Sequence, residues 1–88
     1  MKYLCELVQK EYPYINMGYV RKDSIEKDEL EFARNSGDAL VIEDMETMEK
    51  VLNLIAVFIS DRDHVYVMPW ITEFGKPNKR LFRQDLTF

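Results

Sequence analysis

Residues 44–60 read DMETMEKVLNLIAVFIS and carry the clearest secondary-structure signal in the chain. Asp44 belongs to a residue type that caps helix N-termini, and Glu46 falls in the first turn, where the helix dipole favours a carboxylate. Apolar side chains then recur at helical spacing at Met48, Val51, Leu52, Ile55, Phe58 and Ile59. This pattern predicts an amphipathic helix over residues 45–60 whose apolar face packs against a sheet.

The N-terminal residues 2–12 also carry apolar side chains at helical spacing. Pro13 disfavours helical backbone at the residue that precedes it, so a helix would end there. The sequence therefore predicts a short N-terminal helix. Residues 14–21 then place alternate apolar side chains on one side of an extended chain, which predicts a strand with Gly18 as the site of a bulge.

The segment between that strand and the main helix has two interpretations. Residues 35–38, Asn-Ser-Gly-Asp, have strong turn composition, and the short apolar run after them suits a strand. We expect a hairpin in which residues 29–34 pair with residues 39–43. The alternative is a helix that ends at Gly37.

The C-terminal third predicts a second pair of strands. Residues 64–68 form a β-branched and aromatic run, and Pro69, which cannot donate a hydrogen bond to a sheet, marks the end or an edge of that strand. Residues 75–78 have turn composition, and residues 80–86 suit a returning strand.

Together these elements predict an α+β fold with a mostly antiparallel sheet of four or five strands, packed on the main helix and a short N-terminal helix. The chain is 47% hydrophobic and 32% charged, which is the composition of a folded protein rather than of a disordered segment. Its 88 residues supply enough apolar surface for one core, so residues 1–88 are expected to form a single domain. One face or edge of the sheet is left for a partner protein or for a second copy of the chain.

Composition also bears on the cellular compartment. Cys5 is the only cysteine, so the chain can form neither an internal disulfide nor a four-cysteine zinc site, which favours a reducing, cytoplasmic environment. No apolar run approaches the roughly 20 residues that a membrane-spanning helix needs. We therefore expect no association with a membrane.

The sequence contains no catalytic or cofactor-binding signature. Its three glycines lie too far apart to form a phosphate-binding loop. Asp61, Asp63 and His64 come nearest to a metal site, but their spacing matches no defined motif and suits a solvated turn. These features predict a non-enzymatic domain without a cofactor or a metal.

Charge is distributed unevenly along the chain. The net charge is −4, but residues 23–49 alone hold ten carboxylates against two cations. Such a stretch is either a solvated face or a surface that attracts a basic partner and imitates nucleic-acid phosphates. Our leading hypothesis is a protein-binding module, an acidic inhibitor or adaptor that occupies the surface of a partner protein. The residues expected to contact that partner are Asp28, Glu29, Glu31, Glu43, Glu46 and Glu49.

The C-terminal segment supports an alternative hypothesis, a small RNA- or single-strand-binding domain. There, aromatic residues alternate with basic ones, as in domains that stack bases and contact phosphates. The negative net charge argues against nucleic acid as a partner, because few cations are present to replace its counterions. The residues of this alternative site are Trp70, Lys76, Lys79, Arg80 and Arg83.

Overall fold

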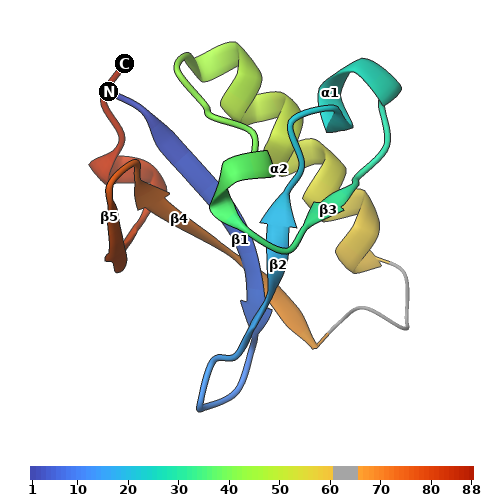
Figure 1. Ribbon diagram of the computed structural model, residues 1–88, viewed down its shortest axis with the longest axis vertical. Coiled ribbons are helices and arrows are strands. Elements are labelled where there is room, and N and C mark those ends of the chain that lie inside the picture. The colour runs from blue at the N-terminus through green and yellow to red at the C-terminus, as the bar shows by residue number, and fades with distance from the viewer. Residues whose placement is uncertain (61–65) are drawn as a thin grey trace.

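The computed structural model describes residues 1–60 and 66–88, apart from the side chains of residues 77 and 78. Within this part of the chain, five antiparallel strands form one sheet in the order β3-β2-β1-β4-β5 (Figure 1). The strands are β1 (Tyr3–Gln9), β2 (Asn16–Val20), β3 (Phe32–Ala33), β4 (Val67–Glu73) and β5 (Lys76–Leu81). The predicted α+β class is confirmed, with an antiparallel sheet and one main helix.

The N-terminal segment forms the central strand β1, so the short helix predicted for residues 2–12 is wrong. β1 pairs with β2 on one side and with β4 on the other. Its side chains that are at most 7% exposed are Tyr3, Leu4, Cys5, Leu7 and Val8. A strand that is buried on both faces carries a nearly continuous apolar run, and the spacing of such a run fits a helix equally well.

The main helix, α2 (Met45–Ser60), has the bounds that its sequence predicts. Asp44 caps it, since its Oδ1 accepts a hydrogen bond from the backbone N–H of Thr47 at 2.7 Å. The side chains by which α2 packs on the sheet and forms the core are Met48, Val51 and Ile55. No helix within residues 1–60 and 66–88 has the length and apolar character that crossing a membrane requires.

The predicted hairpin between residues 29–34 and 39–43 is wrong. β3 has only two residues, and it pairs with β2 instead. Farther along the chain, Ile42 exchanges backbone hydrogen bonds of 2.8 and 2.9 Å with Tyr3. Ile42 is fully buried in that position. Packing of this side chain beside the central strand therefore outweighs the local preference for a hairpin.

The residues around this segment form two short helical turns. α1 (Ser24–Lys27) is a single turn of helix, and Ser36–Asp38 forms a 3₁₀ turn. The side chain of Asn35 accepts a hydrogen bond from the backbone N–H of Asp38 at 3.2 Å. The turn-forming residues thus cap a helical turn, and the alternative of a helix ending at Gly37 is also wrong, because α1 ends ten residues before Gly37.

β4 and β5 form the C-terminal hairpin. β4 begins at Val67, within the strand predicted over residues 64–68, and continues beyond it, so Pro69 lies within the strand. β5 pairs with β4 only from Ile71 onward, so the missing N–H of Pro69 falls where β4 has a free edge. The returning strand β5 begins and ends earlier than the predicted residues 80–86.

The C-terminal residues close one end of the core. The hydroxyl of Tyr3 donates to the carbonyl oxygen of Thr87 at 3.1 Å and accepts from its N–H at 2.8 Å. The ring of Phe88 packs edge-on against the ring of Tyr3, with 5.2 Å between the centroids. The two termini therefore lie side by side (Figure 1).

Candidate functional site

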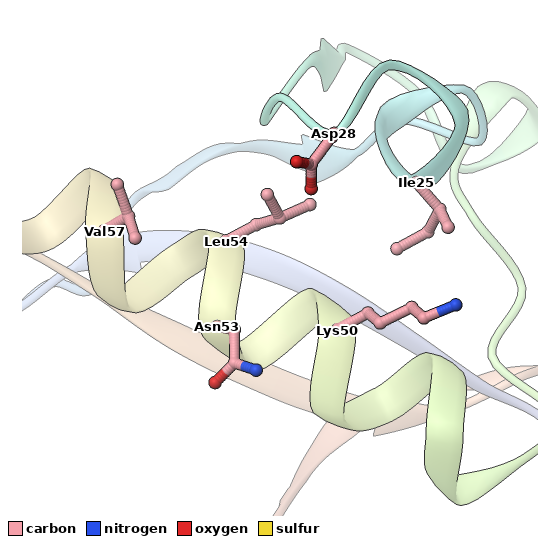
Figure 2. A pocket seen from close by; sticks show the side chains of 6 residues that line it. All are labelled: Ile25, Asp28, Lys50, Asn53, Leu54 and Val57. Atoms are coloured by element: carbon pink, nitrogen blue, oxygen red, sulfur yellow. The ribbon is translucent and has the colours of Figure 1, made fainter.

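A groove of about 530 Å³ lies between α1 and α2 (Figure 2). Ile25 of α1 and Leu54 and Val57 of α2 supply its apolar lining. Val57 is 72% exposed, whereas the core residues of the same helix are at most 2% exposed. α2 therefore carries apolar side chains outside the core, and these line an open groove.

Asp28 lies across this groove from α2, and the end of α1 positions it there (Figure 2). Its backbone is left-handed, with a φ of 51°, and its N–H bonds to the carbonyl oxygen of Ile25 at 3.2 Å. Aspartate tolerates left-handed backbone better than most residues do. The chain therefore reverses at Asp28, and Figure 2 shows its carboxylate pointing toward α2.

The structure disperses the six carboxylates predicted to contact a partner over several elements, and four of them form ion pairs. The pairs are Glu31–Lys27 at 3.8 Å, Glu43–Lys2 at 3.4 Å, Glu46–Lys50 at 3.3 Å, and Glu49–Arg83. Asp28, Glu29 and the neighbouring Glu26 have no ion pair with any described residue. Unpaired negative charge is therefore concentrated at the end of α1, beside the groove.

A second surface is the face of the sheet that points away from α2. Because side chains alternate along a strand, Leu4, Glu6 and Val8 of β1 lie on this face, opposite Cys5 and Leu7. Neither α1 nor α2 packs on this face, because the core that they share with β1 lies on the other side. We call it the uncovered face.

Glu6 is the half-buried carboxylate of the uncovered face, where it lies opposite Trp70 of β4 and Tyr19 of β2. The side-chain amide of Asn16 donates a hydrogen bond to its Oε2. Burial raises the pKa of the Glu6 carboxyl, although the hydrogen bonds from Asn16 and Tyr19 oppose that effect. Burial and the nearby Glu6 charge also raise the pKa of Tyr19.

Arg80 lies on the same face, packed between aromatic rings. Its guanidinium carbon is 5.0 Å from the ring centroid of Trp70 and 4.8 Å from that of Phe82. The ring of Tyr14 lies on Trp70 as well, with 6.1 Å between the centroids. The geometry is that of cation–π contacts, which attract a guanidinium to the faces of aromatic rings.

The structure brings together only part of the predicted nucleic-acid site. Trp70 and Arg80 are in contact. Lys76 pairs with Glu73 at 3.4 Å, and Arg83 pairs with Glu49 on α2. The remaining member, Lys79, is exposed and has no ion pair with a described residue.

Sequence reasoning missed several residues of both surfaces. Phe82 belongs to the aromatic and basic C-terminal segment but is not among the predicted site residues, and neither is Tyr14. Both join the uncovered face through pairing of strands and loops that the sequence does not specify. For the groove, a signal was present: Val57 is an apolar residue on the polar side of the predicted helix.

The described residues include neither a reactive cysteine nor a cluster of metal ligands. Cys5 is buried, and burial raises the pKa of its thiol to about 12, so it is not a reactive thiolate. No group of three potential metal ligands occurs within residues 1–60 and 66–88, while Asp61, Asp63 and His64 lie outside them. Compared with protein-family models, with curated proteins and with solved structures, the chain matches none.

Proposed function

We propose that this domain is a non-enzymatic protein-binding module that holds a basic, partly apolar segment of a partner protein in the groove between α1 and α2. The observation that supports this proposal is the groove itself, in which the exposed Val57 lies near the unpaired carboxylate of Asp28. Lys50 also lines the groove, but its charge is paired with Glu46. Covering the exposed Val57 removes apolar surface from water, which favours association. The carboxylates of Asp28 and Glu29 attract Lys or Arg side chains and fix the orientation of the segment.

The size of the groove suits a short anchor segment. Sites that hold small ligands have volumes of roughly 300–1,000 Å³, so a groove of about 530 Å³ accommodates a few side chains rather than a whole domain. An amphipathic helix presents such anchors at positions one turn apart. An inhibitor or adaptor acts in this way, by occupying a surface of a larger protein.

The single buried Cys5 is compatible with a reducing compartment, and we propose that the protein acts in the cytoplasm.

The test begins with selection of peptides from a random display library on the immobilised domain, followed by affinity measurement with fluorescence anisotropy. We expect the selected peptides to combine Lys or Arg with large apolar residues. Val57→Asp should weaken their binding by about tenfold or more, because it puts a charge at the apolar contact. Ala56→Asp makes the same change at the preceding residue, which is exposed but does not line the groove, and should leave the affinity unchanged.

Two matched pairs of neutralising substitutions test the role of charge. Asp28→Asn with Glu29→Gln removes unpaired carboxylates, whereas Glu46→Gln with Glu49→Gln removes carboxylates that already pair with Lys50 and Arg83. Stopped-flow kinetics across a salt series should show slower association for the first pair, with less effect from the second. If neither salt nor the first pair changes the association rate, the carboxylates are only a solvated face.

The stacked Arg80 favours a second candidate function, binding of RNA or single-stranded DNA on the uncovered face. Two of the four predicted cations, Lys76 and Arg83, are engaged in ion pairs, so we expect only weak binding at physiological salt. Fluorescence anisotropy with labelled single strands measures this. Sub-micromolar binding that weakens after Arg80→Ala with Arg83→Ala would favour this second function over the first.

A further inference from the structure

Arg80 differs from the other arginines that the structure describes. Arg21 and Arg83 form ion pairs with carboxylates, and Arg34 is exposed at the end of β3. Arg80 alone packs its guanidinium against two aromatic rings, and it forms neither an ion pair nor a hydrogen bond with a described residue. Its five N–H donors are therefore available to a ligand.

The surrounding rings prepare this guanidinium for binding. Packing against Trp70 and Phe82 restricts the side chain before a ligand arrives, so less rotamer freedom is lost on association. Phe82 is 51% exposed and Tyr14 is 46% exposed. The cation is therefore bordered by apolar surface that a ligand with its own apolar group can cover.

We propose that the uncovered face binds an acidic segment of a partner protein, in which one carboxylate is held by the guanidinium of Arg80. An apolar side chain next to that carboxylate then lies on the exposed ring of Phe82, which Arg80 contacts. Guanidinium and carboxylate match in geometry and form two parallel hydrogen bonds. This site lies on the opposite face of the sheet from the groove and takes a ligand of the opposite charge, so it does not depend on the proposed function.

The charges around Arg80 favour a carboxylate over a phosphate. Glu6 lies on the same face beside Trp70, and Lys76 is paired with Glu73, so it adds no free positive charge. A phosphate group carries nearly two negative charges, so the nearby Glu6 carboxylate repels it more strongly than it repels a single carboxylate, whose charge Arg80 alone balances. Arg83, another of the predicted cations, is paired with Glu49 and so adds no free positive charge near Arg80.

The intrinsic fluorescence of Trp70 provides the measurement, because it is the only tryptophan in the chain and touches Arg80. The probe is a blocked peptide with one Glu flanked by Leu residues, titrated into the full chain. A peptide with Gln in place of Glu is its control, and inorganic phosphate and an oligothymidylate are titrated in parallel. We expect a saturable change in Trp70 emission with the Glu peptide, and none with the Gln peptide at the same concentration.

Substitutions identify the group that binds. Arg80→Gln should weaken binding of the Glu peptide by about tenfold or more, and Arg80→Lys should weaken it as well, because lysine keeps the charge but not the planar donors. Arg34→Gln removes an exposed arginine next to the strand at the opposite edge of the sheet and should have no effect. Val57→Asp should also have no effect, which separates this site from the groove.

Three results would overturn the proposal. The first is equal binding of the Glu and Gln peptides, and the second is binding that survives both Arg80 substitutions in chains that retain the wild-type circular dichroism spectrum. The third is a change in Trp70 emission at lower concentrations of phosphate or oligothymidylate than of the Glu peptide. That last result would mean that the uncovered face binds phosphate groups. A response to oligothymidylate at lower concentrations than to inorganic phosphate would identify nucleic acid as the ligand that carries them.

Discussion

The two faces of the central strand are both buried, but different neighbours bury them. Cys5 and Leu7 lie beneath α2, in a core that includes Ile55. On the uncovered face, Leu4 and Val8 are only 7% and 3% exposed, although neither helix packs there. Their cross-strand neighbours come from the same sheet. We therefore expect the covered face, where α2 adds a second layer to the core, to provide most of the stability. The uncovered face keeps polar and aromatic groups, such as Glu6 and Trp70, that a ligand can contact.

The largest expected effect tests the covered face. Ile55→Ala should lower the free energy of unfolding by roughly 2–5 kcal/mol, because it removes buried methylene groups and leaves a cavity. Val57→Ala, two residues along the same helix but 72% exposed, should cost about 0.5 kcal/mol or less. Urea denaturation of both variants measures the contrast. Equal losses would mean that α2 packs on the sheet through a different side.

A pair of tyrosines gives a smaller contrast between the faces. Tyr3→Phe on the covered face leaves the N–H of Thr87 without the acceptor it now has, and should cost about 1 kcal/mol. Tyr19→Phe on the uncovered face removes a hydroxyl that is half-buried beside Glu6, and water can replace the lost partner. We therefore expect a smaller cost in urea denaturation. A larger cost for Tyr19 than for Tyr3 would contradict the division of roles between the faces.

The sequence predicts the fold well where local signals and tertiary packing agree. The helix α2 has a capping residue and a long apolar stripe, and its bounds are predicted correctly. The prediction of a helix over residues 2–12, where the structure has β1, is wrong because an apolar run of this length has no periodicity that distinguishes a strand from a helix. The prediction of a hairpin between residues 29–34 and 39–43 is wrong because Ile42 pairs with Tyr3 of the central strand and is buried there.

The candidate sites were less accessible to sequence reasoning because they depend on distant pairs of residues. Glu49 and Arg83 are 34 positions apart in the chain, so no local pattern shows that they neutralise each other. The acidic stretch therefore overstates the free charge, which the structure restricts largely to the end of α1. Contact between Arg80 and Trp70 likewise depends on how β4 pairs with β5, and the sequence does not specify that register.

The smallest expected effect is the pH dependence that Glu6 confers on stability. Burial raises the pKa of this carboxyl above its ordinary value of 4.5, so the folded protein binds the proton more tightly than the unfolded chain does. Folding is therefore least penalised when Glu6 is protonated, and the penalty grows as the pH rises from below 4.5 through the raised pKa. Glu6→Gln mimics the protonated form at every pH.

We thus expect Glu6→Gln and the wild type to be equally stable in acid, and the variant to become slightly more stable as the pH approaches neutrality. The gain should be small, because the carboxyl is only half-buried and solvent screens it. Asp23 and Asp44 contribute the opposite trend, since their pKa values are lowered, but they are present in both proteins and cancel in the difference. Urea midpoints of the two proteins between acid and neutral pH provide that difference.

A difference that stays constant, or that favours the wild type near neutrality, would show that the hydrogen bonds from Asn16 and Tyr19 stabilise the Glu6 carboxylate more than burial penalises it. The uncovered face would then be a stabilised part of the domain rather than one that retains polar groups for a ligand.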